Sequence, residues 1–72
     1  MVVELMLVEL YRVAEVWNAD HSAPAPPEIA ERFQGRLWTL SDLESRAVRI
    51  TSRDAWYTAL GQDWQLILQP AT

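Results

Sequence analysis

The chain has 72 residues and no cysteine, and this combination limits what it can fold into. A chain this short hides only about 60% of its unfolded surface on folding, so burial barely exceeds the conformational entropy that folding costs. Small domains usually add disulfides, a structural metal or a partner subunit. Disulfides are impossible here. We therefore predict a single domain over residues 1–72 that is supported by association with a partner.

The residue types needed for a metal site or an enzyme active site are scarce. Zinc prefers thiolate and imidazole ligands, and His21 is the only histidine. With two glycines in the chain, a Gly-rich phosphate loop is excluded. Asp20, His21 and Ser22 are the residue types of a catalytic triad, but neighbours in one loop cannot converge as nucleophile, base and orienter. We expect no catalytic residue, metal, cofactor or small-molecule substrate.

The charges point to a soluble acidic protein with an uneven distribution. The formal net charge of -4 disfavours nucleic acid and anionic lipid as partners. The acids dominate residues 1–31, whereas residues 32–53 contain five of the six arginines. The start of the chain, MVVELMLVELYRVAEVW, lacks the basic region of a signal peptide, and its charges interrupt any membrane span. We expect a cytoplasmic protein with no membrane segment.

The first segment has the pattern of an amphipathic helix. Over residues 2–17 the polar side chains fall on one half of a helical wheel and the apolar ones on the other. Read as a strand, the segment would place Glu4 and Arg12 on one face but Glu9 and Glu15 on the other. The pattern therefore predicts a helix.

Short helices are expected beyond a proline-rich loop over residues 19–27. Pro27 suits a first helical turn and Gly35 a helix end, which predicts a helix over residues 27–34 with Ile29 and Phe33 facing the core. The sequence Ser41-Asp42-Leu43-Glu44 matches a capping box and predicts a third helix start.

From residue 47 onward two interpretations compete. In one, residues 47–51, 56–60 and 64–68 are strands, with a hairpin loop over residues 61–63. In the other, residues 53–60 form a helix that ends at Gly61, which the poor strand formers Arg53 and Asp54 favour. We therefore predict a small α+β domain with an N-terminal amphipathic helix, two or three short helices and a short C-terminal strand or hairpin. The alternative is a mostly α, helix-turn-helix-like fold.

The apolar content suggests a binding role. Half of the residues are hydrophobic and four are tryptophan, which exceeds what so small a body readily hides. We predict a small non-enzymatic protein-protein interaction or assembly module that self-associates or docks onto a larger protein. The expected interface residues are Val3, Leu7, Leu10, Ala14, Trp17 and Trp38.

Two other functions fit parts of the sequence. The stretch TLSDLESRAVRITSRDAWYTAL resembles a helix-turn-helix in its element lengths, and Arg46, Arg49 and Arg53 would then contact nucleic acid. The acids of residues 1–31 would suit an inhibitor that occupies a basic site on its target.

Overall fold

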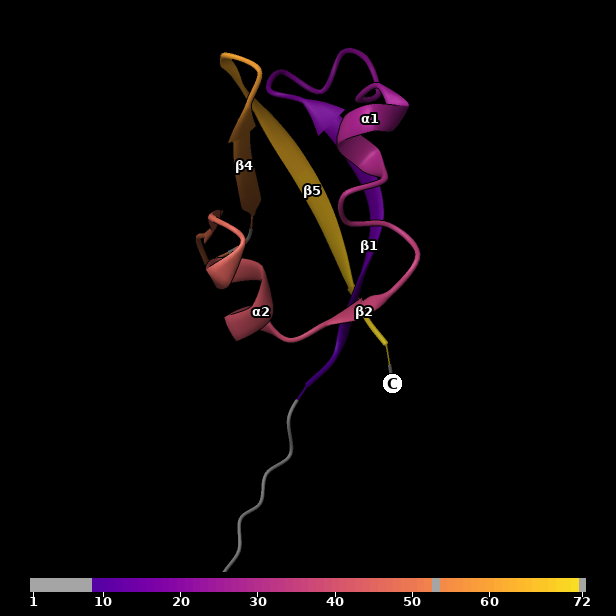
Figure 1. Ribbon diagram of the computed structural model, residues 1–72, viewed down its shortest axis with the longest axis vertical. Coiled ribbons are helices and arrows are strands. Elements are labelled where there is room, and N and C mark those ends of the chain that lie inside the picture. Colours follow the sequence, from indigo (N-terminus) through magenta and orange to yellow (C-terminus); the bar gives the residue numbers. More distant parts are fainter. Residues whose placement is uncertain (1–8, 53, 72) are drawn as a thin grey trace, which may run out of the picture.

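The computed structural model describes residues 9–52 and 54–71. These residues form a curled antiparallel sheet of five strands in the order β2-β1-β5-β4-β3 (Figure 1). Two short helices accompany the sheet. The elements in chain order are β1 (Tyr11–Asn18), α1 (Pro27–Ala30), β2 (Leu37–Trp38), α2 (Leu40–Ser45), β3 (Val48–Ile50), β4 (Ala55–Ala59) and β5 (Gln62–Pro70).

The mostly β architecture shows that the predicted α+β fold with an N-terminal helix is wrong, and so is the mostly α alternative. Residues 11–18 form β1, which pairs with β5 along its whole length. Residues 55–59 form β4, so the favoured helix over residues 53–60 does not exist. The competing interpretation, a meander of three strands after residue 47, describes this part of the chain.

A β-bulge at Ala14 explains why β1 resembles a helix in sequence. Val13 lies opposite Leu68 and Glu15 opposite Ile67, which leaves Ala14 as an extra residue. A bulge of this kind reverses the alternation of side chains along a strand. Arg12 and Glu15 therefore both point to the solvent face, although their parity in the sequence differs. The charges of Arg12 and Glu15 are therefore incompatible with a regular strand but fit one that contains a bulge.

The β4–β5 hairpin turns on Leu60 and Gly61. Ala59 pairs with Gln62, and both turn residues have positive φ, 56° for Leu60 and 78° for Gly61. Positive φ at both central positions is the hallmark of a type I′ turn, whose twist suits a two-residue hairpin. The expected hairpin loop over residues 61–63 is therefore displaced, because Gln62 and Asp63 already belong to β5.

The two helices are short and lie on the same side of the sheet. As predicted, α1 begins at Pro27, and Ile29 and Phe33 are buried, but the helix ends at Ala30 and continues as turns. The capping box of α2 uses Thr39 rather than Ser41. Its hydroxyl accepts a hydrogen bond from the Asp42 N–H, and the Asp42 carboxylate accepts one from the Thr39 N–H.

The core lies between the helices and the inner face of the sheet, which we define as the face that α1 and α2 cover. Phe33 packs its ring against Tyr57 at 4.7 Å and Trp38 at 5.7 Å, measured between ring centroids. The Trp38 indole N–H donates to the Phe33 carbonyl. The buried core residues are Val13, Val16, Ile29, Phe33, Trp38, Leu43, Val48, Ala55, Trp64 and Leu66.

The proline-rich loop over residues 19–27 runs back along β1. The Asn18 N–H donates to the Ala23 carbonyl and the Ala25 N–H to the Val16 carbonyl. At the bulge, the Gln34 side-chain amide donates to the Ala14 carbonyl. With β2 paired to the first two residues of β1, these contacts cover the edge of β1 that does not face β5. An edge protected in this way is less available for strand addition by another chain.

Candidate functional site

The outer face of the sheet, opposite the helices, presents a row of neighbouring side chains from four strands. Trp17 of β1 lies opposite Gln65 of β5, which lies opposite Trp56 of β4, which in turn lies opposite Arg49 of β3. We call these four residues the outer row. Since neighbouring strands are about 4.8 Å apart, the two tryptophans flank Gln65 at a separation of about 10 Å.

The apolar members of this face do not contribute to the core. Trp17, Trp56 and Ile67 are half-buried, yet none of them is among the residues that pack against the core cluster. Trp17 is covered in part by the His21 ring of the proline-rich loop, which stacks on it. A surface that displays two tryptophans and an isoleucine on a solvent-facing sheet is typical of a binding site.

Side-chain contacts hold two members of the outer row, Trp17 and Gln65, in position. The His21 ring stacks on Trp17 with 4.1 Å between ring centroids, and its Nδ1 lies 2.9 Å from the Gln65 Oε1. The Gln65 amide N–H donates to Asp54 at 3.3 Å. The Trp17 indole N–H donates to Glu15 at 2.6 Å. Trp17 and Gln65 are therefore oriented before any partner binds.

An ion pair ends the row on the β3 side. Arg49 lies 3.3 Å from Asp63, and the Thr58 hydroxyl donates to the same carboxylate. The hydrogen bond from Thr58 is the main cause that holds the pKa of Asp63 below its ordinary value of 3.8. Desolvation opposes this effect, and the charge and hydrogen bond of Arg49 lower the pKa further. Asp63 is therefore ionised at neutral pH.

The expected interface residues do not share one surface. Val3 and Leu7 lie outside the described residues. Leu10 is exposed just before β1, and Ala14 forms the bulge. Trp17 alone lies on the outer row. Trp38, expected at the surface, is 1% exposed because its indole packs on Phe33 and bonds to that residue's carbonyl.

The expected nucleic-acid arginines are also separated. Arg46 follows α2 and its guanidinium lies over the Trp38 ring, on the core side. Arg49 lies on the outer face, where Asp63 neutralises it. Arg53 lies outside the described residues. The helix-turn-helix that would have brought them together is absent from residues 9–52 and 54–71.

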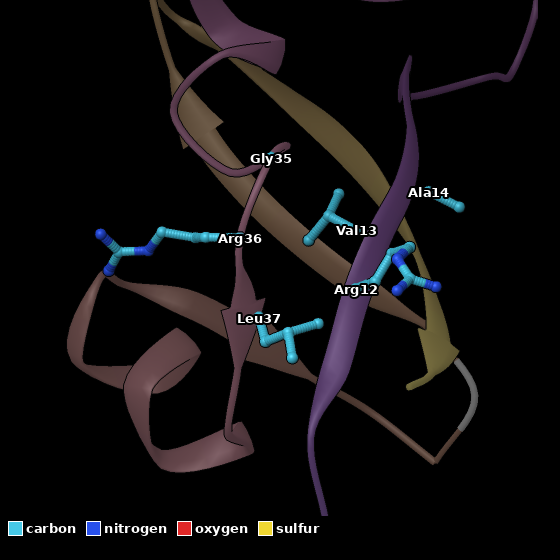
Figure 2. A pocket seen from close by; sticks show the side chains of 6 residues that line it. All are labelled: Arg12, Val13, Ala14, Gly35, Arg36 and Leu37. Atoms are coloured by element: carbon cyan, nitrogen blue, oxygen red, sulfur yellow. The ribbon is translucent and has the colours of Figure 1, made fainter. Parts of the chain in front are cut away.

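A hollow of about 520 Å³ lies where β2 separates from β1, and Figure 2 shows its lining. Val13 and Leu37 point into the gap between the two segments, whereas Arg12 and Arg36 extend to opposite sides. The two guanidiniums do not converge on one point in the hollow. It is an apolar gap between diverging chains rather than a site with a set of ligand-binding groups.

Sequence reasoning missed Trp56 and Gln65 as members of a surface. The signal was present in the alternation of β5, where Trp64, Leu66 and Leu68 are separated by Gln65 and Ile67. The same alternation over residues 55–59 places Trp56 on the face opposite Ala55 and Tyr57. The preference for a helix at residues 53–60 concealed this pattern.

Comparison with known proteins adds no relative. No known protein family, curated protein or solved structure matches the chain. In the described part of the chain, no helix has the length and apolar character needed to cross a membrane. No group of three or more potential metal ligands occurs among these residues.

Proposed function

We propose that the chain is a non-enzymatic interaction module that docks onto a partner protein through the outer face of its sheet. The observation that carries this proposal is the outer row, in which Trp17 and Trp56 flank Gln65 on the solvent side. Tryptophan is among the residues that contribute most to binding energy at interfaces. Because side-chain hydrogen bonds already orient Trp17 and Gln65, less conformational entropy is lost on binding.

The charges of this face favour a partner whose apolar surface is bordered by arginine or lysine. Among the described residues, the outer face carries the carboxylates of Glu15, Asp54 and Asp63 and the guanidiniums of Arg12 and Arg49. Asp63 neutralises Arg49, and the adjacent turn adds Asp20. The face is therefore slightly acidic, which supports docking on a basic target, as in the inhibitor hypothesis.

The same charges favour a different protein over a second copy. Two outer faces packed together would bring like net charges into contact, which opposes association. Self-association is thus an outcome that the experiment must distinguish. A cytoplasmic location is part of this proposal, and microscopy of a fluorescent fusion tests it.

The experiment compares the wild-type chain with two variants. Trp56→Thr removes the anchor but keeps a good strand former on β4. Leu60→Asn is the matched control, because it removes an exposed apolar side chain from the β4–β5 turn outside the outer face. Each tagged protein is incubated with host lysate, and the captured proteins are quantified by mass spectrometry. Light scattering at micromolar concentration measures the oligomeric state.

We expect at least one host protein that the wild type and Leu60→Asn capture in equal amounts. Trp56→Thr should capture at least tenfold less of this protein than the wild type does. With the purified proteins, the affinity of Trp56→Thr for that partner should be lower than that of the wild type by a similar factor, as expected when an interface anchor is removed. A Glu15→Gln variant should reduce the association rate and its salt dependence. If Trp56→Thr captures every protein as well as Leu60→Asn does, the outer face is not the docking site. If the wild type is a dimer and Trp56→Thr is a monomer, the outer face binds a second copy of the chain instead of a different protein.

A further inference from the structure

Three arginines gather on the side of the sheet that the helices cover. Arg36 precedes β2, and its guanidinium carbon lies 4.0 Å from the centroid of the Trp38 ring system. Arg46 follows α2 and lies 5.6 Å from the same centroid. Arg32 follows α1, lies 5.9 Å from the Tyr57 ring and donates to the Tyr57 hydroxyl. We call these three residues the arginine cluster.

No carboxylate of the described residues neutralises the cluster. The ion pair found among these residues is Arg49–Asp63, on the opposite face of the sheet. Arg32 donates to the Glu28 carbonyl and to Tyr57. No hydrogen bond joins the guanidinium of Arg36 or Arg46 to another described residue. Two positive charges thus share one indole in a chain whose net charge is -4.

Stacking leaves these guanidiniums able to bind a ligand. A guanidinium over an aromatic ring is attracted by its face, and its N–H groups project from the edge of the guanidinium plane. Figure 2 shows Arg36 extending away from Arg12 and from β1. Trp38 lies between Arg36 and Arg46 in the chain, and its indole is fixed by the bond to Phe33. The indole therefore acts as a rigid support that brings together arginines from two separate segments.

We propose that Arg36 and Arg46, which share the Trp38 ring, bind a phosphate group. Arginine donors match the oxygens of phosphate in pairs, and two guanidiniums balance the charge of a phosphate dianion. A long polyanion fits less well, because acids lie on the same two helical segments. They are Glu28 in α1, Glu31 at its C-terminal end, and Asp42 and Glu44 in α2. The site therefore suits a single phosphate group, free or carried on a small molecule.

Nuclear magnetic resonance can follow the site directly. Inorganic phosphate is titrated into the ¹⁵N-labelled protein at constant ionic strength, with sodium chloride as the balancing salt. We expect saturable shifts of the Nε–Hε signals of Arg36 and Arg46 and of the Trp38 indole N–H, with a much smaller shift at Arg12. Arg46→Gln should raise the midpoint of the titration at least fivefold, whereas the control Arg12→Gln should leave it unchanged.

Further measurements separate binding from a merely structural role. Arg46→Lys keeps the positive charge over Trp38 but loses the forked donors, so it should retain the fold and still weaken phosphate binding. Adenosine monophosphate identifies the carrier, because tighter binding of it than of free phosphate keeps the site and assigns the phosphate to a nucleotide. Tighter binding of oligothymidylate than of either would overturn the assignment to a single phosphate group. Linear, unsaturable shifts, equal shifts at Arg12, or equally strong binding of acetate would overturn the proposal. The arginines would then serve to cover Trp38.

Discussion

Val13 and Val16 are three residues apart, yet both side chains lie in the core of a β-sheet, at 3% and 4% exposure. A regular strand would place them on opposite faces, and a helix would place them on the same one. The bulge at Ala14 shifts the register by one residue and so brings both valines to the inner face. The spacing that suggests a helix is therefore produced by an irregular strand.

The first prediction concerns this arrangement. Val16→Ala should lower the free energy of unfolding by about 2 kcal/mol, because it removes two buried methyl groups and leaves a cavity opposite Leu66. Glu15→Ala, the exposed neighbour, should change it by less than about 0.5 kcal/mol. Urea unfolding measures both values. Similar losses in the two variants would contradict the assignment of the inner face.

A second prediction concerns the β4–β5 turn. Leu60 is 63% exposed and has a φ of 56°, a conformation that costs a leucine about 1 kcal/mol or more. Asparagine tolerates this conformation, and Asn-Gly is the preferred type I′ sequence. Leu60→Asn should therefore stabilise the protein by up to about 1 kcal/mol in thermal unfolding. Gly61→Ala, at a φ of 78°, should destabilise it by a similar amount, and the opposite order would rule out this turn.

A third prediction distinguishes the two possible caps of α2. Thr39→Ala should cost about 1 kcal/mol, because the N–H of Asp42 loses its acceptor. Ser41→Ala should have little effect, since Ser41 is an exposed residue within the helix. Chemical denaturation of the two variants measures the difference. A larger loss at Ser41 would restore the capping box that the sequence suggested.

The last prediction concerns pH. Because the pKa of Asp63 is lowered in the folded protein, its ionised form contributes stability above the ordinary value of 3.8. This contribution is lost as pH falls through the lower, folded pKa. Thr58→Val removes the main cause and should raise the pKa of Asp63 toward its ordinary value, and Arg49→Gln should raise it less. Titration of the Asp63 carboxyl carbon, followed by nuclear magnetic resonance, measures the pKa in each variant. A larger rise of the Asp63 pKa in Arg49→Gln than in Thr58→Val would contradict this order of the two effects.

Short-range chemistry in the sequence was enough to determine several local features. Pro27 begins α1 because its fixed φ suits a first helical turn, and Ile29 and Phe33, four residues apart, reach the core together. The alternation in β5 likewise identified the last strand before its partners were known. In each case neighbouring residues alone supply the physical cause.

Tertiary structure decided what local patterns left open. Residues 11–18 are a strand because β5 supplies hydrogen-bond partners along the whole segment, and the bulge then places the valines inward. Residues 55–59 are a strand because β3 and β5 pair with them from both sides. Trp38 is buried because Phe33 accepts its N–H and the arginines cover its ring. Strand pairing, strand register and the burial of each tryptophan depend on residues far away in the chain. The propensities that favoured helices act only between residues a few positions apart.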